Sequence, residues 1–247
     1  MTSPRTTRDT RAEKVAAARA AAQKSKTRRR QSIIGGVVVA VLLVAVGVGA
    51  LVQAQRTNTS TSSTAPAGTS GTANQTIAVG VTGAPVTVTL YEDFQCPACK
   101  NLHDTSGPTL QSLVDKGKIR LEYRPIAFLD RFSSTEYATR ALNAAACVVN
   151  SKPAAFTAYH GLLMDNQPPE NTAGLPDTKL TELAAEAGAG GLGTCISDRT
   201  FGGWTKRVTD QSSKDKVNGT PTVLVNGTVL KDTSPAGLTA AVTAAGG

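Results

Sequence analysis

A Cys-x-x-Cys sequence directly after a strand-like run constrains this chain more than any other feature. Residues 86–91 alternate in side-chain character as a β-strand does, and residues 94–100 then read Phe-Gln-Cys-Pro-Ala-Cys-Lys. A cysteine at the start of a helix lies beside N–H groups without intrahelical partners, at the positive end of the helix dipole, and both stabilise a thiolate. We therefore expect Cys96 to be the nucleophile. Cys99, one turn further on the same face, is expected to be the buried thiol that closes a disulfide with Cys96.

The positive charge of the chain is concentrated at its N-terminus. Residues 1–56 contain eleven Lys or Arg and two acidic residues, whereas the other 191 residues contain 15 Lys or Arg and 16 acidic residues. The net charge of +8 therefore describes a basic tail on a nearly neutral domain. This distribution does not favour nucleic acid as a partner.

Residues 33–52 form an uncharged apolar stretch of twenty residues. At about 1.5 Å per residue a helix of this length spans about 30 Å, the thickness of a bilayer core, so we expect one transmembrane helix. Three arginines immediately precede the stretch and only Arg56 follows it, which places the N-terminus, residues 1–32, in the cytoplasm and the cysteines outside the cell membrane. The alternative is a cleaved signal peptide with Val52-Gln53-Ala54 as its cleavage site. Either alternative exports the domain.

Two further segments complete the expected organisation. Residues 53–75 are rich in Ser, Thr, Gly and Ala, which is typical of a flexible linker. Residues 76–247 are long enough for one globular domain with its own core.

The expected elements of this domain alternate first and then become helical. Strands are expected at 77–81, 86–91 and 119–124, with the cysteine-bearing helix between the last two. A helical block follows, and its first helix carries Cys147 after a predicted capping box of Ser133 and Glu136. Residues 222–230 predict a hairpin with an Asn-Gly turn, followed by a last helix. The class is α/β.

With these elements in this order, the sequence resembles the DsbA-like members of the thioredoxin superfamily, of the membrane-anchored bacterial type. The resemblance rests on Asp-Phe-Gln-Cys-Pro-x-Cys at 93–99 and Gly-Thr-Pro-Thr at 219–222, and it covers residues 76–247. It implies a thioredoxin fold with a helical insertion at about 130–205. It also implies that Pro221 is a cis-proline facing the active-site disulfide and that Thr220 presents its backbone to a peptide substrate.

The sequence departs from the family pattern in two places. Leu90 stands where thioredoxin-like proteins carry a buried acid, and Glu92, on the same face of the strand, is the candidate proton relay, with a solvated strand end as the alternative. The Pro97-Ala98 dipeptide lacks the histidine of strongly oxidising DsbA sites, which predicts a milder oxidant.

The two remaining cysteines, Cys147 and Cys195, are 48 residues apart in an exported domain. We expect a structural disulfide between them, with two buried free thiols as the alternative. Zinc is not expected, because Cys96, Cys99 and His103 supply only three ligands at an unusual spacing. His103 and His160 are expected to be surface residues or helix residues with satisfied hydrogen bonds, and no cofactor is expected.

These observations predict an exported, membrane-anchored protein-disulfide oxidoreductase, an oxidase that passes its disulfide to reduced proteins. A reductase or isomerase kept reduced by a membrane electron donor is the alternative, and a non-catalytic peptide-binding domain is the alternative from another class. An oxidase needs a reoxidant, and the resemblance implies a quinone-linked membrane protein, DsbB-like or vitamin-K-epoxide-reductase-like. No dimerisation segment is visible in the sequence, so a monomer is expected.

Overall fold

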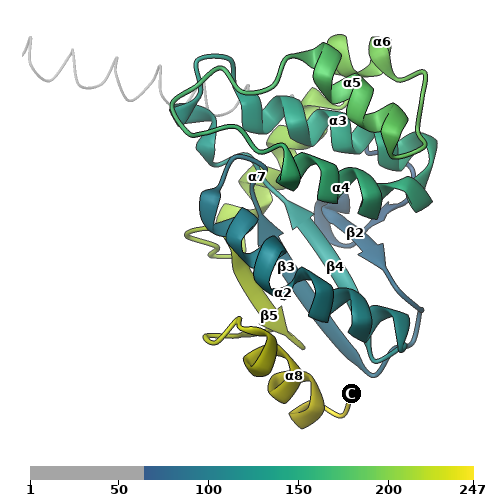
Figure 1. Ribbon diagram of the computed structural model, residues 1–247, viewed down its shortest axis with the longest axis vertical. Helices are drawn as coiled ribbons and strands as arrows, with labels where there is room; N and C mark the ends of the chain where they lie inside the picture. Colours follow the sequence, from purple (N-terminus) through teal and green to yellow (C-terminus); the bar gives the residue numbers. More distant parts are fainter. Residues whose placement is uncertain (1–63) are drawn as a thin grey trace, which may run out of the picture. The chain divides into compact units, whose positions relative to one another are not determined.

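The computed structural model describes residues 64–247 (Figure 1). The basic tail at 1–32 and the transmembrane helix predicted at 33–52 lie outside the described residues. Within residues 64–247, no helix combines the length and the apolar character that a membrane crossing requires.

A six-stranded sheet in the order β1-β2-β4-β3-β5-β6 forms the centre of the domain. The strands are β1 (Thr69–Ser70), β2 (Thr76–Val79), β3 (Val86–Glu92), β4 (Ile119–Pro125), β5 (Thr222–Val225) and β6 (Thr228–Val229). β3 pairs in parallel with β4 and antiparallel with β5. Because β3 is covered on both sides, Val86 and Val88 are fully buried.

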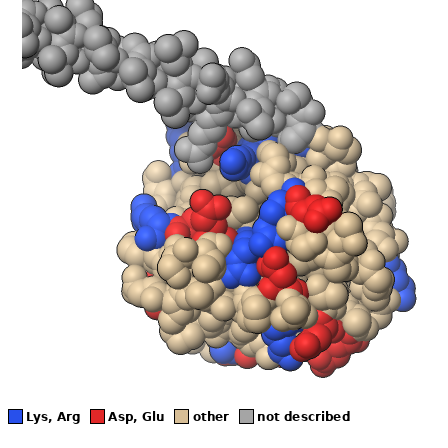
Figure 2. Space-filling model, turned by 90° about the horizontal axis from the view of Figure 1, so that it is seen from above, with Lys and Arg blue, Asp and Glu red and all other residues tan. Residues whose placement is uncertain are grey.

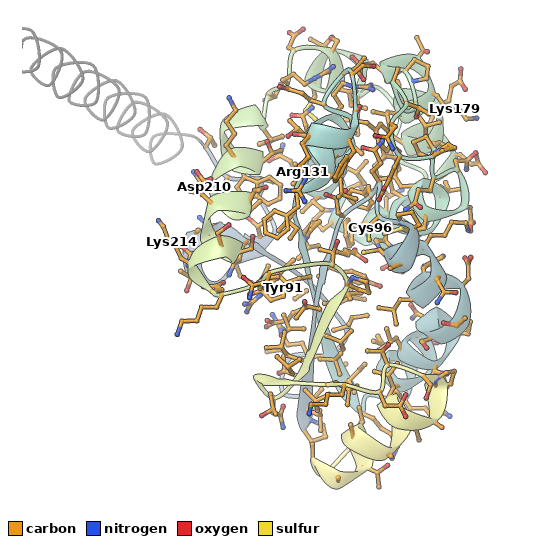
Figure 3. All side chains as sticks on the ribbon, turned by 90° about the vertical axis from the view of Figure 1, so that its left-hand side faces the viewer. Tyr91, Cys96, Arg131, Lys179, Asp210 and Lys214 are labelled. Carbon is orange, nitrogen blue, oxygen red and sulfur yellow. A yellow bond between two sulfur atoms is a disulfide. The ribbon has the colours of Figure 1, made fainter. Side chains whose placement is uncertain are left out.

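Helices cover both faces of this sheet and form a separate block at one end (Figures 1 and 3). Helices α2 (Pro97–Asp115) and α8 (Pro235–Ala244) lie on one face, and α7 (Gly202–Lys214) lies on the other. The block comprises α3 (Tyr137–Ser151), α4 (Phe156–Asp165), α5 (Asp177–Glu186) and α6 (Gly193–Ser197), with short 3-10 turns at η2 (Leu129–Phe132) and η3 (Pro153–Ala155). The expected thioredoxin fold with a helical insertion is therefore present.

Local sequence explains the two elements that frame the site. Cys96 is the N-cap of α2 and Pro97 occupies its first position, where a missing N–H costs the helix nothing. The hairpin between β5 and β6 turns at Asn226 and Gly227, both with positive φ, as a type I′ turn requires.

The domain begins earlier in the chain than the sequence indicated. Residues 64–75, assigned to the flexible linker, include β1, which pairs with β2, and a 3-10 turn, η1 (Thr72–Asn74). The indole Nε1 of Trp204 donates a hydrogen bond to the carbonyl oxygen of Asn74, and the side chain of Gln75 is buried. The sequence did not predict that this segment belongs to the domain, because it is poor in apolar residues and its contacts are made mainly by the backbone.

The predicted capping box at the start of α3 is wrong. The helix begins at Tyr137, and Glu136 has a positive φ of 53° and makes no capping hydrogen bond. The hydroxyl of Ser133 accepts a hydrogen bond from the N–H of Tyr137, and the carboxylate of Asp130 accepts hydrogen bonds from the N–H and the hydroxyl of Thr139. Asp130, upstream of the predicted box, and Ser133 therefore satisfy this helix end without Glu136.

Two kinds of contact join α3 to α6. Cys147 and Cys195 form a disulfide with their Cα atoms 6.1 Å apart. Beside it, the buried Asn143 donates a hydrogen bond to the carbonyl oxygen of Ile196 and accepts one from the N–H of Phe201.

On the face of the domain shown in Figure 2, acidic and basic side chains are interspersed, so this face has no large patch of a single charge.

Candidate functional site

Cys96 lies at the start of α2, beside the helical block (Figure 3), and Cys99 follows in the first turn of the helix. Both are free thiols. Cys96 is 7% exposed and Cys99 is 1% exposed, so Cys99 is buried as expected, whereas Cys96 is more covered than an open helix start suggests. Only a small part of the Cys96 side chain is open to a reaction partner.

The surroundings of Cys96 stabilise its thiolate. A hydrogen bond from the Cys99 side chain is the largest influence, and together with hydrogen bonds from Thr220 and from the backbone of Cys99 and Ala98 it lowers the pKa of Cys96 to about 6, against the opposing effect of burial. Hydrogen bonds to the charged form of a group lower the pKa of an acid. Cys96 is therefore ionised at neutral pH.

The surroundings of Cys99 have the opposite effect. Burial raises the pKa of this thiol far above its ordinary value, and its hydrogen bond to Cys96 and the charges of Cys96 and Glu92 raise it further. The N–H of Asp93, 3.5 Å from the Cys99 sulfur, opposes this only in part. The two thiols are thus strongly unequal, one charged and partly accessible and the other neutral and buried.

The segment that precedes β5 faces Cys96 directly. The peptide bond between Thr220 and Pro221 is cis. In its protonated form, the Cys96 thiol donates a hydrogen bond to the carbonyl oxygen of Thr220 at 3.3 Å. The two motifs on which the family resemblance rests are therefore brought together in space.

Glu92 ends β3 in the interior of the domain. Its side chain is 2% exposed, so the alternative of a solvated strand end is excluded. Nε2 of His160, which is itself buried, lies 2.7 Å from Oε1 of Glu92, and neither atom has a hydrogen-bond partner elsewhere in residues 64–247. His160 is therefore paired with a carboxylate inside the domain and is not a surface residue.

Asp93 is a further buried carboxylate beside the cysteines, and the sequence reasoning assigned it no role. It accepts hydrogen bonds of 2.9 Å from the N–H groups of Gln95 and Leu129. Burial nevertheless raises the pKa of Asp93 to about 7, and a charged Cys96 contributes to this rise. The sequence did contain an indication of this role, because Asp93 is the first residue of the motif at 93–99.

A loop from the helical block covers the other side of Cys96. The amide Nε2 of Gln167 donates a hydrogen bond of 3.0 Å to the carbonyl oxygen of Cys96, and Gln95 donates a longer one, 3.4 Å, to the carbonyl oxygen of Pro169. Sequence reasoning missed Gln167, because nothing in the residues around it indicates a contact with the cysteines.

Within residues 64–247, one group of potential metal-ligand atoms lies close together. The atoms belong to His103, Asp104 and Asp165 and lie within 4.8 Å of one another. Both carboxylates are exposed, and such groups are common on protein surfaces without an ion. This arrangement does not identify a metal site, and it does not include the cysteines.

Comparisons with known proteins agree with this geometry. A family model described as Thioredoxin matches residues 72–244. Disulfide bond formation protein D of Bacillus subtilis is 27% identical over 158 residues, which are 62% of this chain and 69% of that protein.

Two solved structures from Mycobacterium tuberculosis are similar over most of their length. The reduced form of DsbA is 33% identical, with a TM-score of 0.63 over 70% of this chain and 93% of that one. The reduced form of the disulfide bond oxidoreductase DsbG is 33% identical, with a TM-score of 0.64 over 71% of this chain and 89% of that one.

Proposed function

This chain belongs to the thioredoxin family as a DsbA-like protein-disulfide oxidoreductase, and from that premise we propose that it is an oxidase that donates the Cys96–Cys99 disulfide to reduced proteins. In this proposal Cys96 is the residue attacked by substrate and Cys99 is the thiol released and later reoxidised. The substrates are envelope and secreted proteins that still carry free thiols.

The inequality of the two thiols is the observation that carries the proposal. A thiol whose pKa is lowered to about 6 is stabilised in the reduced protein, and this makes the corresponding disulfide easier to reduce. A disulfide that is easily reduced passes its oxidising equivalents to substrate. The relative named for disulfide bond formation is consistent with the same direction.

The transfer proceeds in two exchanges. A substrate thiolate attacks Sγ of Cys96, the Cys96–Cys99 bond breaks, and Cys99 leaves as a thiolate that takes up a proton. A second substrate thiolate then attacks the substrate sulfur of the mixed disulfide and releases Cys96 as a thiolate. The substrate is oxidised to a disulfide and the enzyme is reduced by two electrons.

We assign the docking of the substrate chain to Thr220 and Pro221. An extended peptide can pair its backbone with the segment that leads into β5, as in other cases of strand addition. Because the Thr220 carbonyl oxygen lies 3.3 Å from the Cys96 sulfur, a chain held there presents its own cysteine to the reacting atom.

The proposed location is the cell membrane, with the catalytic domain outside. Its support is the uncharged stretch at 33–52 and the basic residues within 1–32, which orient the N-terminus toward the cytoplasm. The reduced enzyme needs an oxidant after each turnover, and a quinone-linked membrane protein, DsbB-like or vitamin-K-epoxide-reductase-like, is the proposed partner. Membrane fractionation combined with protease accessibility tests the location, and release of a shortened protein into the medium would identify a cleaved signal peptide instead.

The direction of the reaction is tested by the reduction potential of the full-length chain in detergent. Equilibration with glutathione buffers should give a value between those of thioredoxin, about −270 mV, and DsbA, about −120 mV. The oxidised protein should also introduce disulfides into a reduced model substrate in stoichiometric amounts. A potential below that of thioredoxin would contradict the oxidase assignment and favour a reductase.

A further inference from the structure

A small cavity lies between Cys99 and the pair formed by Glu92 and His160. It has a volume of about 20 Å³, and its walls include all three of these residues together with Tyr123 and His103. A space of this size accommodates about one water molecule. Cys99 and Glu92 therefore border the same small interior space, although both side chains are almost fully buried.

A second, larger hollow of about 460 Å³ opens to solvent on the other side of the two histidines. His103, Tyr123 and His160 line both this hollow and the small cavity. The rings of His103 and His160 are 5.4 Å apart between centroids, and His103 Nε2 lies 3.9 Å from the exposed carboxylate of Asp165. The small cavity at Cys99 and the solvent-facing hollow therefore share lining residues, and two of these are imidazoles.

The titratable groups that face His160 come from four elements. They are Glu92 of β3, Cys99 and His103 of α2, Tyr123 of β4 and, beyond His103, Asp104 of α2 and Asp165 of α4. Burial raises the pKa of Tyr123, so this phenol does not act as a base near neutral pH. Burial also lowers the pKa of His103, with a smaller contribution from His160, so His103 is a neutral imidazole that can accept a proton.

We propose that His160 is a proton-relay residue that connects the Glu92 carboxylate beside Cys99 to the solvent-facing hollow at His103. Glu92 cannot pass a proton to solvent directly, because its side chain is almost fully buried. Among residues 64–247, its Oε1 atom has His160 as a neighbour and no other hydrogen-bond partner. The imidazole can accept a proton from one side and release it on the other. His160 acts through Glu92 and positions the proton transfer without touching substrate.

The relay is required when the active-site disulfide closes. After a partner disulfide has reacted with Cys96, the neutral Cys99 thiol must lose its proton before its sulfur can attack Sγ of Cys96. The proton passes to Glu92 and through His160 to the hollow, the Cys96–Cys99 bond forms, and the partner leaves as a thiolate. The same route runs in reverse when substrate opens the disulfide. The inference rests on the oxidoreductase reaction of Cys96 and Cys99 and is independent of its net direction.

The two steps can be separated with an aromatic disulfide whose released thiolate is coloured. The reduced full-length chain in detergent is mixed with excess 5,5′-dithiobis(2-nitrobenzoate) in a stopped-flow instrument. The first equivalent of coloured thiolate reports attack by Cys96, and the second reports closure by Cys99. In the wild type, the rate of the second phase should rise with pH, because the Cys99 thiol must lose its proton before its sulfur attacks.

The His160→Gln variant should keep the first phase and slow the second by about 100-fold or more at neutral pH. Gln111 lines the same hollow without contacting Glu92, so Gln111→Ala is the matched control and should leave both phases unchanged. Glu92→Gln should slow the second phase as well, and adding His160→Gln to it should cause little further loss, since both residues serve one route.

Rescue distinguishes proton transfer from packing. In His160→Gly, added imidazole should restore the second phase, whereas pyrazole, which has the same shape but is a much weaker base, should not. Equal rescue by both compounds, or a second phase in His160→Gln as fast as in the wild type, would overturn the relay while leaving the enzyme assignment intact. If the wild type itself released no second equivalent, the assignment of Cys96 and Cys99 as the redox pair would fail instead.

Discussion

The thiol of Cys96 donates a hydrogen bond to the backbone carbonyl oxygen of Thr220, 3.3 Å away, although 124 residues separate them in the chain. This contact joins the start of α2 to the segment before β5. Gln167 bonds to the carbonyl oxygen of Cys96 from the helical insertion. Cys96 is therefore contacted by both the thioredoxin core and the insertion, and only a small part of the residue is exposed.

Replacing Cys99 and replacing Cys96 should have opposite effects on the capture of substrate as a mixed disulfide. Cys99→Ala should increase mixed disulfides on Cys96 by at least about tenfold, because outside thiols lack the effective concentration of a neighbouring one. Cys96→Ala should capture nothing. Non-reducing gels of membrane protein from cells expressing each variant measure the adducts. Adducts in Cys96→Ala that disappear when Cys147 and Cys195 are also replaced would show that the wrong pair has been assigned.

The stability of the reduced protein should depend on the ionisation of Cys96. Its pKa is lowered in the folded state to about 6, whereas a free thiol ionises near pH 8.5. The stabilisation is therefore absent below about pH 6 and grows by about 1.4 kcal/mol per pH unit up to about pH 8.

This increase should appear as the difference in free energy of unfolding between the reduced wild type and reduced Cys96→Ser. The difference is needed because the pKa of Asp93 is raised to about 7, which makes both proteins less stable as the pH rises toward that value. Denaturant titrations over this pH range provide the measurement. A difference that does not change with pH would contradict the lowered pKa of Cys96.

Asp93→Asn should make Cys96 more acidic. Removing the carboxylate removes a like charge near the thiolate wherever Asp93 is ionised, so we expect the pKa of Cys96 to fall. Asparagine offers a single oxygen to the N–H groups of Gln95 and Leu129, so unfolding should become easier by about 1–3 kcal/mol. The pH dependence of alkylation by iodoacetamide measures the first effect, with the exposed Asp104→Asn as the control that leaves it unchanged. A rise in the pKa of Cys96 would oppose this account.

The double variant Cys147→Ser/Cys195→Ser should lose stability and retain activity. Opening a 48-residue loop removes up to about 4 kcal/mol in the chain-entropy model. The hydrogen bonds of Asn143 to Ile196 and Phe201 keep α6 in place below the new melting temperature. Thermal melts and oxidative refolding of a substrate test the two parts. Unchanged stability would mean that the bond does not support the insertion.

The sequence by itself determined the elements whose causes are local. Alternation of side chains predicted β3, the Cys-Pro start predicted α2, and Asn226-Gly227 predicted the last hairpin, because each depends on residues a few positions apart. The unequal roles of Cys96 and Cys99 also followed from helix geometry, and their pKa values are displaced in opposite directions.

Only the tertiary structure decided which distant side chains surround these elements. It brought His160 to Glu92 and Gln167 to Cys96. It also placed Asp130 at the start of α3, where a capping box of Ser133 and Glu136 had been predicted. It also made residues 64–75 part of the domain through backbone pairing of β1. Sequence periodicity reports which face of an element is apolar, but it does not report which face of another element will meet it. The partners of buried polar groups are therefore set by packing, since a carboxylate withdrawn from water is stabilised by whatever donor the fold places beside it.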